Sequence, residues 1–467
     1  MNTVANILEF VGGDLPAPWA ARWAAFLFTL FVLSLEISLA ASQAFLAVAG
    51  VLYGIYLWQA RPPIRFLPVK LPLALFCLFS VLSIFWSVNP AAGWFAVRKL
   101  VLFLIWLLAV NLVQSPRQLR RLLEGLFLVS LLASVVGIVQ FIIQYRSVRV
   151  LYPHDIYDHL TSYRIHGMMG HWMHFGGQQM LIFTLLLAYL LLAAREDRNS
   201  KIGNRNWKIE TGNSQPPATP ENRAGSLDSN FDLRISTLWW VVLAFAVLSI
   251  LLNFTRGVWL GCFLAGVYIL ARWRPKWVLA LPVLMALAYV GAPSLVRERI
   301  HMALHPTEDP ALSIRFEMWD VALRMIRAHP WVGVGPNNIE EVYDLYRQPG
   351  SRPLVGYRDH FHNDYLQFGA ERGLPCLAAW IWLMGALGWY TWKLRGRLAR
   401  ASGRQVWIAD AALAAGLAFL AEGCFEFNFG TSPVLMVFLF VTATPFIAAR
   451  VAASGSVTQP GKGECIS

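Results

Sequence analysis

The sequence predicts an all-α integral membrane protein with about twelve transmembrane helices and one large loop on one side of the membrane. Of its 467 residues, 57% are hydrophobic and 14% are charged, a composition typical of membrane proteins and not of soluble enzymes. A helix that crosses a bilayer needs roughly 20 mostly apolar residues, and about a dozen such runs occur along the chain. The net charge of +12 follows largely from cationic connectors between these runs, so it does not indicate nucleic-acid binding.

The apolar runs place the predicted helices along most of the chain. The predicted spans are 21–39, 42–59, 69–86, 96–113, 122–144, 176–194, 236–253, 257–272, 276–292, 374–392, 406–424 and 432–450. The first two are separated so narrowly that they are expected to form a hairpin. An even number of crossings puts both ends of the chain on the same side of the membrane.

Lysine and arginine residues gather in alternate connectors, and this pattern orients the chain. They are Arg61, Arg65 and Lys70; Arg117, Arg120 and Arg121; Arg272, Arg274 and Lys276; and Lys393, Arg395, Arg397, Arg400 and Arg404. Cytoplasmic loops carry an excess of such residues, so these connectors and both termini are predicted to be cytoplasmic. Residues 195–235, rich in Asn, Ser, Pro and Gly, are predicted to form a flexible cytoplasmic loop, and 451–467 a cytoplasmic tail.

All ten histidines lie in two connectors on the opposite side. They are His154, His159, His166, His171 and His174 in the first, and His301, His305, His329, His360 and His362 in the second. The second connector, 292–373, is too long for a passive turn and carries nine arginines against the usual charge bias. Arginines kept on this face indicate anionic ligands. The chain therefore divides into helices one to nine (1–291), a catalytic loop (292–373) and helices ten to twelve (374–450).

Two short helices are predicted inside this loop. The run 312–328 is amphipathic, Pro310 can occupy the first helical position before it, and Pro330 ends it. Arg315, Trp319, Ala322, Ile326 and His329 follow the three-four spacing of one helix face. A glycine-rich turn follows, and 337–347 is predicted to form the second helix.

Three arginines are candidates for binding an anion. Arg256 occupies a very short connector between predicted spans seven and eight, so it must lie at the membrane edge. It can serve as a fixed cation for a phosphate at headgroup depth, or it can simply reach toward the interface. Arg315 lies on the predicted loop helix, and Arg164 lies in the first histidine connector. The alternative for both is an ion pair with a loop carboxylate.

His362 is the candidate reactive side chain. It precedes Asn363 and Asp364 and lies 11 residues before Gly373, or about three helical turns, so His362, Gly369 and Gly373 are predicted to share one helix face. Glycines on that face would let another helix or a lipid chain approach closely. The alternative is a polar helix start with ordinary packing glycines.

No metal site or disulfide framework is predicted. The His171-x-x-His174 pair lacks the glutamate of a zincin motif and further ligands at useful spacing. The five cysteines are scattered, and four lie in or beside apolar runs, where they are expected to act as small packing residues.

At this point the residues resemble the O-antigen ligase and polymerase superfamily. The matching motifs are His362-Asn363 with Gly373 nine residues later; Ser313-Ile314-Arg315 with Trp319 and His329-Pro330-Trp331-Val332-Gly333-Val334-Gly335; and Thr255-Arg256-Gly257. The twelve-span layout with one large loop is similar too, so the resemblance covers most of the chain. One departure is Cys376, where the ligase pattern has Gly, Thr or Tyr, and it keeps the polymerase relatives open as an alternative.

The resemblance implies a membrane glycosyltransferase of the C type (GT-C) that is inverting, independent of metal and without a cofactor. It implies a donor glycan on undecaprenyl diphosphate at the periplasmic face of the bacterial inner membrane. The acceptor would be lipid A–core, another lipid-linked repeat unit or a protein. By motif, His362 is the expected catalytic residue, and Arg256 and Arg315 are the expected diphosphate binders. Arg164, Asn363 and Asp364 complete the set of candidate substrate-binding residues.

The chemistry of these side chains agrees with that reading. An acceptor hydroxyl must lose its proton as it attacks, and an imidazole that titrates near neutrality suits that role. His362 could instead bind the diphosphate, and both roles remain open; Asp359, His360 or Asp364 could orient it. The predicted function is O-antigen ligation to lipid A–core in lipopolysaccharide biosynthesis. The alternatives are a polymerase of the same superfamily and a transporter or flippase for a lipid-linked glycan, for which no inverted repeat is visible.

Overall fold

The computed structural model describes residues 18–196, 237–305, 310–348, 359–401 and 405–456, and these residues form helices without any strand. The predicted cytoplasmic loop at 195–235 and the predicted tail at 451–467 lie largely outside this part of the chain. The all-α prediction is therefore confirmed for the residues that are described.

A helix lies at each of the twelve predicted spans. In chain order they are α2 (Trp19–Ser34), α3 (Leu39–Ala60), α4 (Lys70–Leu82) with the 3-10 turn η1 (Ser83–Trp86), α6 (Leu104–Leu112) after α5 (Pro90–Val97) and the 3-10 segment η2 (Arg98–Phe103), α7 (Pro116–Leu151), α9 (Trp172–Ala188) continued by the π-helical η3 (Tyr189–Ala193), the helix Thr237–Leu252, α12 (Arg256–Trp273), α13 (Lys276–Gly291), α17 (Asp364–Ala401), α18 (Val406–Glu422) and α19 (Ser432–Ser456).

Several of these helices have the length and composition of membrane spans. Among the described residues, 6 helical segments are long and apolar enough to cross a bilayer: Leu39–Ala60, Pro90–Leu112, Pro116–Leu151, Trp172–Glu196, Asp364–Arg400 and Ser432–Val451. Shorter apolar helices accompany them, including α2 and α13. The chain is therefore a multi-pass membrane protein. A count of twelve crossings stays a prediction, because α12 begins on an arginine and α18 has only 17 residues.

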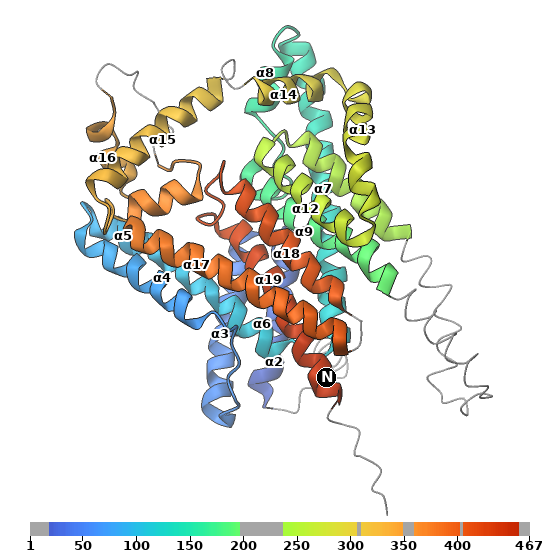
Figure 1. Ribbon diagram of the computed structural model, residues 1–467, viewed down its shortest axis with the longest axis vertical. Helices are drawn as coiled ribbons and strands as arrows, with labels where there is room; N and C mark the ends of the chain where they lie inside the picture. The colour runs from blue at the N-terminus through green and yellow to red at the C-terminus, as the bar shows by residue number, and fades with distance from the viewer. Residues whose placement is uncertain (1–17, 197–236, 306–309, 349–358, 402–404, 457–467) are drawn as a thin grey trace, which may run out of the picture.

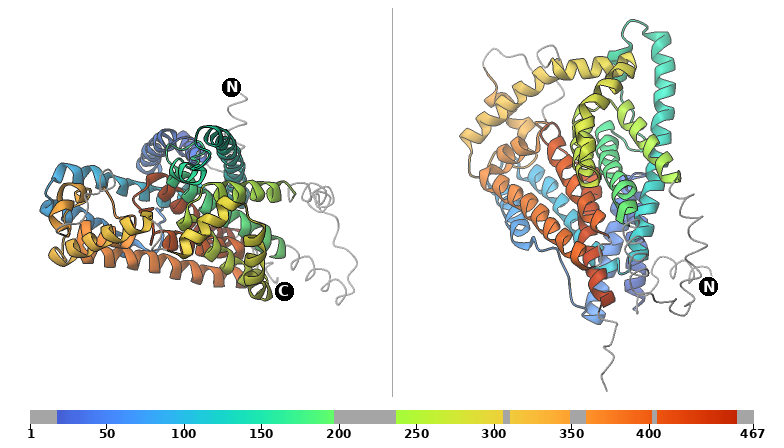
Figure 2. Two further views of the ribbon diagram at one scale, coloured as in Figure 1. Left: turned by 90° about the horizontal axis from the view of Figure 1, so that it is seen from above. Right: turned by 45° about the vertical axis from the view of Figure 1, so that its right-hand side comes forward.

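The connectors that carry the histidines gather at one end of the molecule. Figure 1 shows α8 (Ile156–Ser162), α14 (Ser294–Leu304), α15 (Pro310–Ala328) and α16 (Ile339–Tyr346) at this end, whereas α3 and α17 finish toward the other. The side view in Figure 2 shows α7 standing alongside the bundle up to the same end. With 36 residues, α7 is about 54 Å long at 1.5 Å per residue and so exceeds a bilayer core of about 30 Å.

The centre of the bundle is built from α18 and α19. Phe419, Phe438 and Phe440 are each at most 1% exposed, and the rings of Phe419 and Phe438 stack with centroids 4.0 Å apart. Small residues let α12 pack closely on α18: a Cβ added to Gly261 would lie 3.0 Å from the Ala418 carbonyl oxygen. The loop between α18 and α19, residues 423–431, is called the α18–α19 connector below, and this packing holds it beneath α15.

The two predicted loop helices are confirmed as α15 and α16, with their boundaries close to expectation. The predicted face of α15 does turn toward the bundle. Arg315 reaches the α18–α19 connector, the Trp319 indole N–H donates to the Phe361 carbonyl at 3.0 Å, and Ala322 is fully buried. Ile326 covers Gly369 of α17, where an added Cβ would lie 2.8 Å from the Ile326 Cδ1. His329 instead bonds the Tyr346 hydroxyl at 2.7 Å.

The prediction that His362 and Gly373 share a regular helix face is wrong. His362 precedes α17 and has φ of 48°, in the left-handed region, while Gly373 breaks α17 with φ 81° and ψ 168°. The break has a physical cause, because a Cβ on Gly373 would lie 2.4 Å from the Trp331 carbonyl oxygen. It is the backbone of the loop that approaches closely here, rather than another helix or a lipid chain.

The glycine-rich turn after α15 is paired with this break in α17. The Val334 and Gly335 amides donate to the carbonyls of Ala370 and Glu371, each at 2.9 Å. The Leu374 amide donates to the Pro330 carbonyl at 2.7 Å. These three bonds form a backbone clamp, defined by residues 330–335 and 370–374, which fixes α15 against the start of α17. The glycines of the sequence motif therefore allow these two stretches of backbone to lie in direct contact.

We expect Gly373→Ala to destabilise the protein by about 1–3 kcal/mol, because alanine is strained at this φ and its methyl group meets the Trp331 carbonyl. The matched control is Gly385→Ala on the same helix, where nothing lies within 4 Å of an added Cβ. The measurement is the thermal unfolding midpoint of each purified variant in detergent. Equal midpoints for the two variants would contradict the clamp.

Candidate active site

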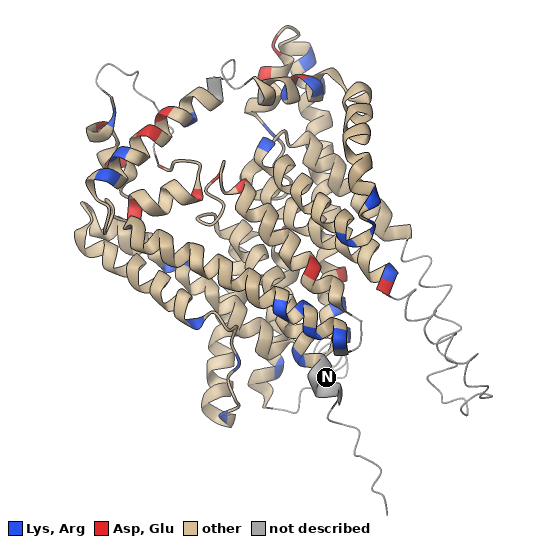
Figure 3. Cartoon of the chain, in the orientation of Figure 1, with Lys and Arg blue, Asp and Glu red and all other residues tan. Residues whose placement is uncertain are grey.

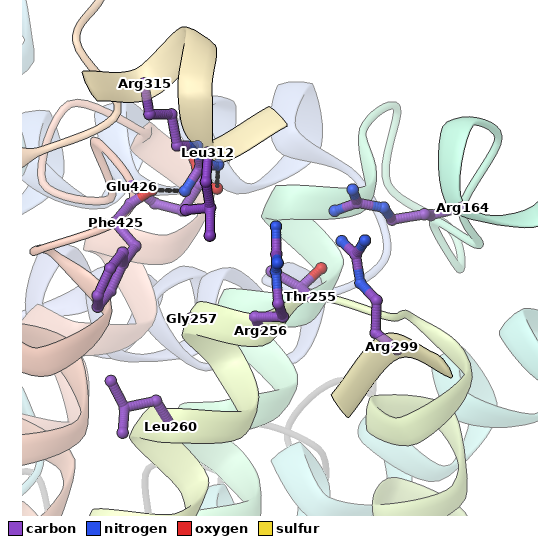
Figure 4. A pocket seen from close by; sticks show the side chains of 10 residues that line it. All are labelled: Arg164, Thr255, Arg256, Gly257, Leu260, Arg299, Leu312, Arg315, Phe425 and Glu426. Carbon is purple, nitrogen blue, oxygen red and sulfur yellow. Dashed lines mark hydrogen bonds and ion pairs between the residues drawn. The ribbon is translucent and has the colours of Figure 1, made fainter. Parts of the chain in front are cut away.

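A cavity of about 300 Å³ opens where the helical bundle meets α14 and α15. Five segments supply its walls: the stretch after α8, the start of α12, α14, α15 and the α18–α19 connector (Figure 4). Its lining residues are Arg164, Thr255, Arg256, Gly257, Leu260, Arg299, Leu312, Arg315, Phe425 and Glu426. This set, called the arginine cavity below, sets four guanidinium groups against one carboxylate.

Arg256 enters the cavity from the first turn of α12. This helix begins at Arg256, directly after Thr255, so the amide groups of its first turn lie beside the same space. The N-terminus of a helix carries a partial positive charge and unpaired N–H groups, both of which favour an anion. The Arg256 guanidinium donates to the Met302 carbonyl of α14 at 3.3 Å. The side chain therefore lies across the cavity rather than out toward the lipid interface.

Arg164 and Arg299 complete one side of the cavity, and in Figure 4 their guanidinium groups converge with that of Arg256. Arg299 is only 7% exposed, and its Nε donates to the Phe254 carbonyl at 3.0 Å. Arg164 donates to the Thr161 carbonyl at 2.7 Å and stacks on the Trp172 ring at 3.9 Å. Carbonyl and aromatic partners hold these cations in place without neutralising them.

Arg315 faces this group from α15 and belongs to a chain of three charged or titratable side chains. Its Nη2 lies 2.5 Å from Glu426 Oε1, and its Nη1 donates to the Phe425 carbonyl at 2.6 Å. The other carboxylate oxygen, Glu426 Oε2, lies 2.9 Å from His362 Nδ1. Glu426 therefore joins the arginine cavity to the imidazole, and its side chain is only 5% exposed.

The titration behaviour of Glu426 fixes the direction of its hydrogen bonds. Burial alone would raise the pKa of the Glu426 carboxyl, but Arg315 and His362 together outweigh it and lower the pKa to about 2. An ionised carboxylate only accepts hydrogen bonds, so His362 Nδ1 must donate. In the neutral imidazole this leaves the Nε2 lone pair available. Burial lowers the pKa of His362 against the opposing charge of Glu426, so the neutral form prevails near pH 7.

Among the described residues that line the cavity, four arginines stand against the single carboxylate of Glu426. Burial, reinforced by the like charge of Arg299 and the other cavity arginines, lowers the pKa of the Arg164 guanidinium to about 9, although Glu426 opposes the shift. Guanidinium groups that lie close together in a half-buried space repel one another, and an anion bound between them relieves that repulsion. The arrangement can bind a multiply charged anion such as a diphosphate, and it can stabilise negative charge that develops there.

Asn363 and Asp364 do not line the arginine cavity. Asn363 Nδ2 donates to the Cys424 carbonyl at 2.9 Å, and its Oδ1 accepts from the Leu366 amide at the start of α17. The Asp364 amide donates to the Gly423 carbonyl at 2.7 Å, and its Oδ1 accepts from the Phe429 amide at 3.1 Å. These bonds hold the α18–α19 connector against His362. A direct substrate contact by either residue stays a prediction.

The side chains proposed to orient His362 are also placed. His360 lies with its ring centroid 4.2 Å from that of His362, and its Nδ1 is 3.0 Å from Asp359 Oδ2. The hydrogen bond with His360 lowers the pKa of the Asp359 carboxyl below its ordinary value. The group that bonds His362 itself is Glu426, which none of the sequence candidates included.

Sequence reasoning missed two residues of this site, Arg299 and Glu426. Arg299 was one of nine arginines in its loop, and its position two residues after Arg297 gave no signal of which would turn inward. Glu426 lies in the connector between predicted spans eleven and twelve. A carboxylate between two apolar runs was a usable signal, of the same kind that singled out Arg256.

His171 and His174 lie close together at the start of α9, with ring centroids 5.4 Å apart. Across the residues that the structure describes, no group of three His, Cys, Asp or Glu side chains is placed to hold a metal ion. The pair is therefore no part of a three-ligand metal site within the described chain.

Comparison with known proteins identifies one domain. Residues 241–381 match the family model described as O-antigen ligase. The match spans somewhat under a third of the chain and takes in Arg256, Arg299, Arg315 and His362, whereas Arg164 and Glu426 lie outside it. No curated protein matches the chain. The chain thus carries a domain of the O-antigen ligase and polymerase type, a family of enzymes that transfer glycans in membranes, set among membrane-spanning helices.

We expect Arg299→Gln to weaken binding of inorganic pyrophosphate by roughly 10-fold or more, because it removes a charge-assisted hydrogen-bond donor. The matched control is Arg297→Gln, an exposed arginine on the same helix. The measurement is calorimetric titration of the full-length protein in detergent at two salt concentrations. Equal pyrophosphate affinities for the two variants would show that Arg299 does not contribute to anion binding.

Proposed function

We propose that the protein is a glycosyltransferase that moves a glycan from undecaprenyl diphosphate to an acceptor hydroxyl at the periplasmic face of the bacterial inner membrane. The observation that carries the proposal is the arrangement of the arginine cavity beside the buried pair of His362 and Glu426. The O-antigen ligase domain at 241–381 supports it, since it contributes most of these residues.

The arginines bind the diphosphate of the donor and stabilise its departure. Negative charge on the diphosphate grows as the glycosidic bond breaks. Arg256, Arg299 and Arg315 line one cavity, and this supports a role for them in stabilising that charge. Such preorganised cations act strongly because little water surrounds them. The polyprenyl chain leaves along the apolar wall, where Leu260 is 36% exposed on the outer surface of α12 and Phe425 faces it (Figure 4).

His362 is the general base. Its Nδ1–H is held by Glu426, so Nε2 takes the proton of the acceptor hydroxyl as that oxygen attacks the sugar carbon. Attack from the side opposite to the leaving diphosphate inverts the anomeric centre. Glu426 stabilises the imidazolium that forms, without accepting the proton itself, because its pKa is too low. No metal ion or cofactor is required for these steps.

The topology that goes with this function is a GT-C type fold with twelve crossings. Residues 292–373 form the periplasmic catalytic loop, and the connectors rich in Lys and Arg face the cytoplasm. Figure 3 supports this orientation, because basic residues gather where α17 ends, away from α14 and α15. Nucleotide sugars are cytoplasmic, so a periplasmic transferase needs a donor carried on a lipid.

The acceptor that we favour is lipid A–core, which makes the protein an O-antigen ligase of lipopolysaccharide biosynthesis. The alternative within the same superfamily is a polymerase for O-antigen or exopolysaccharide, whose acceptor is another lipid-linked repeat unit. A deletion strain distinguishes them. Accumulated long lipid-linked chains with an intact core indicate a ligase, and single-repeat capping or loss of exopolysaccharide alone indicates a polymerase.

We expect His362→Ala, Arg256→Ala and Arg315→Ala each to reduce glycan transfer by roughly 10²–10³-fold, the scale for losing one group that stabilises a transition state. The measurement is turnover of an undecaprenyl-diphosphate-linked glycan by the purified protein, with lipid A–core as acceptor. Transfer near the wild-type rate in all three variants would contradict the assignment of these residues to the active site.

Two controls accompany this assay. Addition of EDTA should leave transfer unchanged, and its abolition would overturn the metal-independent mechanism. A transporter or flippase would use the same arginines as a binding funnel, so the lipid-linked glycan is also followed in proteoliposomes. Movement of the glycolipid across the membrane without glycan transfer would favour that class.

We expect transfer by the wild type to decline with falling pH only below the ordinary histidine pKa of 6.5, because the base must be neutral and burial lowers its pKa. In Glu426→Gln the charge that opposes this shift is lost, so the acid limb moves to still lower pH while the maximum rate falls by about 10–100-fold. The measurement is the pH profile of the transfer rate. A rate that rises as His362 becomes protonated would show that it binds the diphosphate as a cation instead.

A further inference from the structure

A second cavity, with a volume of about 280 Å³, lies between the start of α4 and the later part of α17. Lys70, Leu71 and Pro72 line it from α4, and Trp382, Ala386 and Tyr390 line it from α17. It is called the α4–α17 groove below. Figure 1 shows the two helices side by side, and they pack against each other. The groove shares no lining residue with the arginine cavity, so it is a separate feature of the described chain.

Away from the groove, toward the backbone clamp, α4 and α17 are in direct contact. The Arg372 guanidinium donates to the Ser80 hydroxyl at 2.9 Å, and the Ser80 hydroxyl lies 3.4 Å from the Cys376 sulfur. At 1.5 Å per residue, Lys70 lies about 15 Å along α4 from Ser80, which is about half the thickness of a bilayer core. The groove is therefore at a different membrane depth from the clamp.

Aromatic side chains on α17 indicate that the groove lies near a membrane surface. Trp382, Trp389 and Trp392 are 48%, 57% and 49% exposed, and the exposed Lys393 follows the last of them. Tryptophan and tyrosine are enriched where a bilayer meets water, and lysine at the end of a membrane helix reaches toward the headgroups. In the proposed topology this surface is cytoplasmic.

Two ammonium groups lie at the groove. Lys70 is exposed and lines it from α4. The Lys393 Nζ lies 6.0 Å from the centre of the Tyr390 ring and 4.8 Å from that of Trp389, so cation–π contacts hold it beside a ring that lines the groove. No carboxylate is among the described residues that line the groove. A ligand in the groove therefore meets positive charge without a compensating negative one.

The remaining surface of the groove is largely apolar. Leu71 is 60% exposed there, and Pro72, Trp382 and Ala386 continue the same wall. A free phosphate would leave this apolar wall uncovered, and a zwitterionic headgroup would bring a further ammonium group close to the lysines. An acyl chain that carries an anionic headgroup matches both the wall and the charges.

We propose that the α4–α17 groove binds an anionic phospholipid of the adjacent leaflet, such as phosphatidylglycerol. Lys70 and Lys393 bind the phosphate of its headgroup, and an acyl chain lies along Leu71, Trp382 and Ala386. The lipid contacts both helices and so holds the start of α4 against α17. Because it binds the folded protein, it stabilises that state. This site is independent of glycan transfer and does not rest on the proposed function.

The test is native mass spectrometry of the full-length protein in detergent, titrated with phosphatidylglycerol or with phosphatidylethanolamine of the same acyl chains. Phosphatidylglycerol should bind more tightly and raise the thermal unfolding midpoint. Lys70→Gln and Lys393→Gln should each weaken its binding by about 5-fold, the scale for one lysine at an anionic membrane surface, and the double variant by about 25-fold. Binding of phosphatidylethanolamine should change little in these variants.

Two matched controls accompany the lysine variants. Lys276 is exposed and begins α13 as Lys70 begins α4, but it does not line the groove, so Lys276→Gln should bind phosphatidylglycerol as the wild type does. Ala386→Trp fills the groove without changing its charge and should weaken binding of phosphatidylglycerol by roughly 10-fold. Ala378→Trp, at an exposed position of α17 outside the groove, should not. Thermal midpoints without added lipid check that each variant is folded.

Three outcomes would overturn the proposal. They are equal affinity of the wild type for the two phospholipids, equal loss of phosphatidylglycerol binding in Lys70→Gln and Lys276→Gln, and unchanged binding in Ala386→Trp. Glycerol phosphate, which has the charge but no acyl chain, should not compete with phosphatidylglycerol at equal concentration. Full competition would show that the groove binds a soluble anion instead and would also overturn the proposal.

Discussion

The carboxylate of Glu426 is the interaction on which the site depends. One oxygen pairs with Arg315 and the other accepts from His362, so a single buried group sets the position of a cation and of a base. A buried carboxylate is stable in the ionised form only when its partners are well placed, and here they hold its pKa near 2. Displacing any one of the three would leave a buried charge without its partner. In the proposed mechanism, Glu426 therefore couples recognition of the leaving group by Arg315 to activation of the acceptor by His362.

The rest of the fold can be understood as support for that carboxylate. The α18–α19 connector carries Glu426. Asn363 and Asp364, where α17 begins, form hydrogen bonds with the backbone of this connector. The backbone clamp between 330–335 and 370–374 then ties α15, and with it Arg315, to the same helix. Three elements that are distant in the sequence are thus fixed relative to one another by hydrogen bonds to or between backbone groups, which tolerate little displacement. This gives the motif glycines a structural explanation that does not involve the substrate.

Apolar run length was enough to predict a helix at each of the twelve predicted spans. The amphipathic pattern between Pro310 and Pro330 predicted α15, and the turn after it marked the place of α16. Charge placed against expectation was enough to find Arg256, Arg315 and Arg164, which do meet in one cavity. The helical continuation back from Gly373 to His362 could not be excluded from periodicity, because the left-handed backbone at His362 and the break at Gly373 are imposed by contacts with distant segments. Arg299 and Glu426 were missed for a related reason: only the fold decides which of several charged side chains turns inward.

The low dielectric of the cavity explains why its cations are arginines. Burial, together with the like charge of the neighbouring arginines, lowers the pKa of Arg164 to about 9. An arginine shifted this far is still protonated at neutral pH, whereas a lysine starts about 2 to 3 units lower and would lose most of its charge in the same place. Guanidinium groups are thus the cations that keep their charge in the driest part of the site.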